Sequence, residues 1–122
     1  MARKAAPAGM QIEGGTVTQG VPLITEPGAR AVAADAVAAL AERLANYDAV
    51  IVGAFGDPGR ERLANALRVP VVGIGQASMA EATRLSGGRF AVATTTPRLR
   101  ESICPPADAF GVGGAPVPCR PP

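Results

Sequence analysis

Three segments of the chain place glycine, hydroxyl, amide or carboxylate groups directly after an apolar run. They are Ala54–Gly59, Gly73–Ser78 and Thr94–Pro97. Each leads from a predicted strand into a predicted helix, whose first backbone N–H groups lack intrahelical partners and favour an anion. In an open parallel sheet such corners lie together beyond the carboxyl ends of the strands, where ligands bind. The spacing therefore predicts one shared site for a negatively charged ligand, such as a substrate carboxylate.

The candidate substrate-binding residues come from these three corners. They are Phe55, Gly56, Gly75, Gln76, Thr94, Thr95 and Thr96. The threonine hydroxyls and amides can hydrogen-bond a carboxylate, but β-branched residues that end a strand and cap the next helix give the same pattern. The aromatic ring is interpreted as a pocket wall or core residue rather than as a stacking platform.

Asp57 is the ionisable residue of the first corner, and two interpretations apply to it. Its carboxylate could act as a general acid or base. An aspartate followed by proline is also typical of a helix start, with Asp57 as the N-cap and Pro58 as the first helical residue. The capping interpretation is favoured.

The second corner partly matches a dinucleotide-binding fingerprint, G-x-G-x-x-G. Gly73 and Gly75 fit the first two positions, whereas Ser78 replaces the third glycine. The acidic residue that would bind a ribose about 20 residues further on is replaced by the threonine run. Tight packing of the strand against the helix is the favoured explanation of these glycines, so we expect no cofactor.

Strand and helix signals alternate between these corners. Strands are predicted at 16–18, 49–55, 69–74 and 90–94, and helices at 29–46, 58–67, 76–85 and 98–103. The run 49–55 has no polar alternation, as in a parallel strand covered on both faces. Val37, Leu40 and Leu44 form an apolar stripe at helical spacing. The alternation predicts an α/β fold with an open parallel sheet and flanking helices.

The two ends of the 122-residue chain differ in composition from its middle. Residues 104–122 include six prolines and three glycines, which favour neither a helix nor a central strand. We therefore predict a loose N-terminal segment at 1–15, one domain at 16–103 and an irregular tail at 104–122. The abrupt change after Ile103 raises the hypothesis that the tail is a frame-shifted reading of a longer gene.

Composition excludes several classes of function. Histidine is absent, which removes Ser-His-Asp triads, Cys-His dyads and His-ligated metals, and no metal site is expected. Cys104 and Cys119 lie in the tail and do not by themselves form a disulfide framework. Aromatic residues make up 3%, and the net charge of +2 is spread along the chain, so no nucleic acid is expected as partner. No apolar run approaches the ~20 residues of a membrane span, and a cytoplasmic protein is predicted.

Residues 47–59, Tyr-Asp-Ala-Val-Ile-Val-Gly-Ala-Phe-Gly-Asp-Pro-Gly, resemble the Asp/Glu/hydantoin racemase superfamily, most closely its hydantoin and allantoin racemases. Residues 69–77 and 89–98 are similar to the family's next two elements, in the same order and spacing. The resemblance covers residues 16–103. It implies a partial racemase-type domain and cofactor-independent racemisation or epimerisation at a carbon next to a carbonyl.

The same resemblance implies a mechanism. Family members place the substrate between two pseudo-symmetric α/β domains, each of which contributes a cysteine. One thiolate removes the α-proton, and the opposite thiol returns a proton to the other face. Inverting a stereocentre needs an acid and a base on opposite sides of a planar carbanion, with hydrogen-bond donors near the enolate.

This chain departs from the family pattern in three ways. Ala54 stands where the first catalytic cysteine usually stands, and a methyl group cannot move a proton. The family's opening strand, with its Asn-Pro-Asn type loop, has no match before residue 16. We expect no counterpart of the second domain within these 122 residues, because neither Cys104 nor Cys119 has the glycine-flanked context of its cysteine. Removing one positioned acid–base group costs about 10²–10⁴ in rate, so we expect weak or no activity from the chain alone.

Three functions are weighed. The leading hypothesis is an isomerase of the amino-acid or hydantoin racemase type, acting on a small carboxylate or hydantoin-like substrate. The alternative is a non-catalytic remnant of that fold that binds a small carboxylate. A nucleotide-binding domain is third and is disfavoured by the missing acid. A homo-oligomer could complete the site, because a partial domain leaves an apolar sheet edge and face uncovered.

Overall fold

The computed structural model describes residues 2–94, 96–99 and 103. Its elements in chain order are α1 (Ala2–Ala5), α2 (Pro27–Ala38), α3 (Ala41–Leu44), β1 (Val50–Val52), α4 (Arg60–Ala66), β2 (Val71–Gly73), α5 (Ile74–Ser86) and the 3₁₀ turn η1 (Pro97–Leu99). The irregular tail expected at 104–122 lies outside the described residues. None of the helices in the described ranges is long and apolar enough to cross a membrane.

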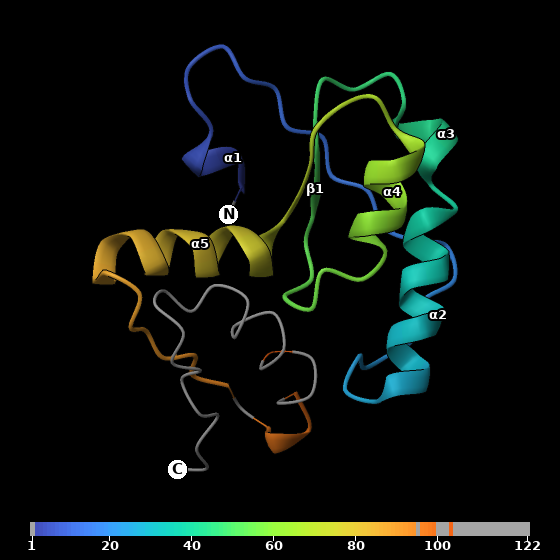
Figure 1. Cartoon of the computed structure of the whole chain (residues 1–122). Coiled ribbons are helices and arrows are strands. Elements are labelled where there is room, and N and C mark those ends of the chain that lie inside the picture. The colour runs from blue at the N-terminus through green and yellow to red at the C-terminus, as the bar shows by residue number, and fades with distance from the viewer. Residues whose placement is uncertain (1, 95, 100–102, 104–122) are drawn as a thin grey trace.

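β1 and β2 form a parallel pair that is connected through α4. The register pairs Val50 with Val71, Ile51 with Val72 and Val52 with Gly73. Pro70 directly precedes β2, where its missing N–H costs no ladder bond, and its carbonyl oxygen accepts from the Val50 amide at 2.9 Å. Figure 1 shows α2, α3 and α4 grouped on one side of β1 and α5 on the other. The predicted α/β class with an open parallel sheet and flanking helices is confirmed.

The core lies between β1 and the helices α2 to α4. Val50, Val52 and Leu63 are buried there, and Leu63 is only 1% exposed. Val37 and Leu44 from the predicted apolar stripe pack against this cluster. The helical spacing of the stripe therefore correctly predicted which side of this helical segment faces the sheet.

The predicted helix at 29–46 is divided into two. Helix α2 begins at Pro27, earlier than predicted, because the first helical position needs no intrahelical N–H bond. At its end the Leu40 amide donates to the Val37 carbonyl, three residues back, at 3.1 Å. This tighter turn separates α2 from α3.

Helix α4 begins at Arg60, two residues later than predicted. Asp57 and Gly59 have φ values of 48° and 74°, which are incompatible with a right-handed helix. A Cβ atom at Gly59 would lie 2.7 Å from the carbonyl oxygen of Ala34, so glycine lets the start of α4 approach α2. An ion pair between Arg62 and Asp35 joins the same two helices.

Helix α5 also differs at its start. It begins at Ile74, directly after β2, where the sequence predicted the end of a strand. Its end agrees with prediction, because Gly87 closes the helix with a φ of 69°.

Two predicted strands, at 16–18 and 90–94, are wrong. Both segments are irregular, and among the described residues neither forms backbone hydrogen bonds with β1 or β2. Residues with a preference for strands form one only where a neighbouring strand pairs with them, and none pairs with either segment in the described part of the chain. The predicted helix at 98–103 is represented by η1, and residues 100–102 lie outside the described part.

The expectation that β1 is covered on both faces is also wrong. Ile51 is 60% exposed, and Val72, its partner in the register, is 40% exposed. Helices α2 to α4 cover the opposite face, onto which Val50 and Val52 project, whereas α5 leads away from the sheet (Figure 1).

Candidate functional site

The segments that follow β1 and β2 meet at the carboxyl ends of the strands. The Phe55 carbonyl oxygen lies so close to Gly75 that a Cβ atom there would overlap it. The Asp57 carboxylate lies against Gly73 in the same way. Two of the three predicted corners are therefore in contact, and glycine is required on the α5 side of that contact. We call this contact region, residues 54–57 with 73–76, the β1–β2 corner.

Asp57 occupies the N-terminus of α5. Its Oδ1 accepts a hydrogen bond from the Gly75 amide at 2.9 Å, and its Oδ2 accepts one from the Gln76 amide at 2.7 Å. Charge-assisted bonds of this kind are stronger than neutral ones, and the positive end of the helix favours the carboxylate. Asp57 is thus a helix cap, as favoured, but it caps α5 instead of its own helix α4, whose N-cap is Gly59.

This arrangement changes the interpretation of the second corner. The amides of Gly75 and Gln76 were expected to be free to receive a ligand carboxylate, and each already donates to the chain's own carboxylate. A ligand carboxylate at these two amides must displace Asp57. At the β1–β2 corner, the chain itself thus supplies the anion that these amides bind. Hydrogen bonds to both oxygens hold the Asp57 carboxylate in one orientation.

Ala54, Phe55 and Gly56 are the other predicted site residues within the β1–β2 corner. Ala54 is half-buried at the end of β1, and its carbonyl oxygen accepts from the Asp57 amide at 2.8 Å. Phe55 is 38% exposed, and Gly56 is exposed. Phe55 therefore leaves part of its apolar surface in contact with solvent at the corner.

The two described threonines of the run, Thr94 and Thr96, form no hydrogen bond with the β1–β2 corner. Thr94 is exposed in an irregular segment, and Thr95 lies outside the described residues. Thr96 uses its Oγ1 to accept from the Arg98 amide at 3.4 Å, as a cap of η1. Among described residues no hydrogen bond links Thr94 or Thr96 to Asp57, Gly75 or Gln76, so a role in ligand binding stays a prediction for all three threonines.

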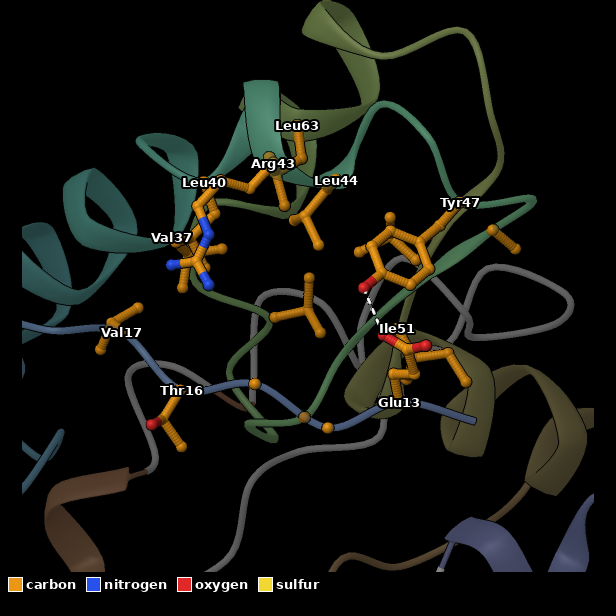
Figure 2. A pocket seen from close by; sticks show the side chains of 16 residues that line it. Glu13, Thr16, Val17, Val37, Leu40, Arg43, Leu44, Tyr47, Ile51 and Leu63 are labelled. Carbon is orange, nitrogen blue, oxygen red and sulfur yellow. Dashed lines mark hydrogen bonds between the residues drawn. The ribbon is translucent and has the colours of Figure 1, made fainter. Parts of the chain in front are cut away.

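Sequence reasoning missed a cavity of about 390 Å³ that lies along β1. It is lined by residues 13–17, by β1 and by side chains of α2 and α3 (Figure 2). The apolar stripe of α2 and α3 was visible in the sequence. The sequence did not show that part of this stripe stays uncovered, because residues 13–17 were expected to lead into a strand.

A hydrogen bond spans one end of this cavity. The Tyr47 hydroxyl donates to Oε2 of Glu13 at 2.5 Å (Figure 2). This bond, with the negative charge of Glu13, raises the pKa of Tyr47 above its ordinary value, against a smaller opposite effect of Arg43. The bond ties residues 13–17 to the chain that enters β1.

The donor set of the described residues offers no group of three or more His, Cys, Asp or Glu side chains that could hold a metal ion. Cys104 and Cys119 lie outside those residues.

Comparison with known proteins identifies the family. A sequence model of the Asp/Glu/Hydantoin racemase family matches residues 1–118, which include the corner and the cavity. Nothing matches the chain among curated proteins or among solved structures. The resemblance seen in residues 47–59 is thereby confirmed. The chain belongs to the Asp/Glu/hydantoin racemase family.

Proposed function

We propose that the chain catalyses slow proton exchange at the carbon next to the carbonyl of a small amino-acid or hydantoin-type substrate. The observation that carries the proposal is the β1–β2 corner, which brings Ala54, Phe55 and Asp57 to the start of α5 in a chain of the racemase family. In that family the activity in general is racemisation, and small substrates are its targets.

The chemistry expected at the corner follows from its groups. Removal of an α-proton leaves a carbanion whose charge moves onto the carbonyl oxygen, so a base and nearby donors are needed. The methyl group of Ala54 supplies no base. Asp57 carries the one carboxylate of the corner, and Phe55 offers an apolar wall that would exclude water from the reacting carbon. Exchange through Asp57 would be slow, because both of its oxygens accept hydrogen bonds from amides.

The test uses the full chain in heavy water with single enantiomers of a hydantoin, aspartate and glutamate. Proton NMR follows the loss of the α-proton signal. We expect slow deuterium incorporation into one of these substrates. Ala54→Cys should raise the rate about 100-fold, because a thiolate at a strand end beside a helix N-terminus is a favoured base. Ala54→Ser is the matched control of similar size, and its rate should stay at that of the unchanged chain.

A failure to exchange in both the unchanged chain and Ala54→Cys would contradict the proposal. A second candidate function then remains, favoured by alanine at position 54. The chain would bind a small carboxylate without acting on it. Saturable binding of aspartate, glutamate or a hydantoin by calorimetry, without deuterium exchange, would identify that function.

A further inference from the structure

The cavity along β1 has an apolar wall. Val37, Leu40 and Leu44 line it from α2, α3 and the turn between them, and Ile51 lines it from β1 (Figure 2). Its volume of about 390 Å³ lies within the roughly 300–1,000 Å³ of small-molecule sites. Ala54, Phe55, Asp57, Gly75 and Gln76 do not line it, so the cavity is a different place from the β1–β2 corner.

Arg43 gives one end of the cavity a positive charge. Figure 2 shows its guanidinium beside Val37, directed toward Val17 on the opposite wall. No carboxylate among the described residues forms a salt bridge with it. Three other exposed arginines form ion pairs: Arg62 with Asp35, Arg84 with Glu81, and Arg98 with Glu26. Arg68 and Arg89 are exposed without a salt bridge among the described residues, but neither lines the cavity.

Glu13 is the acidic residue of the lining, and it lies at the other end. Figure 2 places it beside Ile51, where it accepts the hydrogen bond of Tyr47. The cavity therefore has a cationic end at Arg43, an acidic end engaged by a phenol, and an apolar wall between them.

We propose that this cavity binds a small aliphatic monocarboxylate. The planar guanidinium of Arg43 would pair with the ligand carboxylate through two parallel N–H···O bonds. The aliphatic chain would lie on Val37, Leu40 and Leu44, where each buried methylene contributes about 0.8 kcal/mol in transfer from water. Apolar surface and an arginine without a carboxylate partner are the two features that such a ligand satisfies together.

Hexanoate is the probe, and the protein supplies its own signal. Tyr47 lines the cavity, and the chain contains one tyrosine and no tryptophan. Tyrosine fluorescence of the full chain should therefore change saturably as hexanoate is added. Arg43→Gln should weaken binding about tenfold, in line with the loss of a charged hydrogen-bonded pair. Neutral 1-hexanol, which has the same chain length, should bind the unchanged protein about tenfold more weakly than hexanoate.

Arg68→Gln is the matched control, because Arg68 is exposed and does not line the cavity. It removes the same charge and should leave hexanoate affinity unchanged. Circular dichroism should show both variants folded, as expected for substitutions at exposed positions. Amide chemical-shift changes on hexanoate addition should map to residues 13–17 and 37–53.

Three results would each overturn the proposal: no saturable binding of hexanoate, equal weakening by Arg43→Gln and Arg68→Gln, or equal affinity for hexanoate and 1-hexanol. Shift changes centred on residues 54–57 and 73–76 would place the ligand at the β1–β2 corner and contradict the separate site. Proton exchange at the corner is measured on other substrates, so either proposal can fail while the other stands.

Discussion

The β1–β2 corner and the cavity along β1 share one strand, but they differ in whether their charged side chain already has a partner in the described structure. At the corner, the Asp57 carboxylate accepts from two helix amides, and two glycines admit it without space to spare. In the cavity, Arg43 has no carboxylate partner among the described residues, and about 390 Å³ beside it is not filled by side chains. The corner binds its own anion, whereas the cavity has a charge and a volume that a ligand can use.

This difference shows that a helix N-terminus at a strand end is not sufficient for a ligand site. Free amides there attract an anion, but the anion can come from the chain itself. Asp57 lies 18 and 19 residues before the amides that it caps. Two kinds of substitution test this comparison. One disturbs the close packing and the capping bonds of the β1–β2 corner, and the other removes the Tyr47–Glu13 hydrogen bond at the cavity.

The largest effect is expected from Gly75→Ala. The added Cβ would overlap the carbonyl oxygen of Phe55, which is backbone and cannot move aside as a flexible side chain can. Overpacking of this kind typically costs about 1–3 kcal/mol, and we expect about 3 kcal/mol of unfolding free energy to be lost. Urea unfolding followed by circular dichroism measures it.

Gly53→Ala is the control for that substitution. Gly53 lies between β1 and the corner, and a Cβ atom there would meet nothing within 4 Å. Alanine should leave stability unchanged or raise it by about 0.4–1 kcal/mol, because it restricts the unfolded chain. Equal losses at positions 53 and 75 would show that the corner is not closely packed.

A smaller loss is expected from Asp57→Ala. It leaves the amides of Gly75 and Gln76 without their acceptor, which should cost about 2 kcal/mol by the same urea measurement. Asp57→Gly removes the same carboxylate but suits the φ of 48°, so it should cost about 1 kcal/mol less than alanine. Equal stability of Asp57→Ala and the unchanged chain would contradict the capping role.

Local patterns in the sequence predicted the parts of the fold that depend on neighbouring residues. The apolar run at 49–55 contains β1, and the stripe of Val37 and Leu44 faces the core. The glycine after residue 86 ends α5. The segments 16–18 and 90–94 were predicted incorrectly, because a β-rich composition does not supply a pairing partner, and none lies beside them in the described structure.

The candidate site was less predictable. Convergence of the first two corners follows from parallel topology and could be deduced. The choice of α5 over α4 as the helix that Asp57 caps could not, since the nearest amides in space belong to a segment 18 residues away. The cavity had no local signal, because it depends on how residues 13–17 pass over β1. Thr95 and residues 104–122 lie outside the described residues, so what was predicted for them stays a prediction.

The smallest effect is expected at the Tyr47–Glu13 hydrogen bond beside the cavity, and the pKa of Tyr47 reports it. The hydrogen bond to Glu13 and the charge of Glu13 raise the pKa of Tyr47 above 10.0. Because Tyr47 is the one tyrosine of the chain, phenolate absorbance reports it alone. We expect its midpoint in the folded protein to lie above that of a free tyrosine, and Glu13→Ala to lower it. Glu13→Gln, which keeps an acceptor and removes the charge, should give an intermediate value.

The sign of the accompanying stability change follows from the same pKa. The protonated phenol is favoured in the folded state, so the contribution of the Tyr47–Glu13 bond is complete below the unfolded pKa near 10.0. It is lost as the pH rises through the higher folded pKa. Stability of the unchanged chain should therefore fall more steeply above pH 10 than that of Glu13→Ala. Identical titration of Tyr47 in both proteins would show that the Tyr47–Glu13 bond does not span the end of the cavity in solution, and that the corner is the more ordered of the two regions.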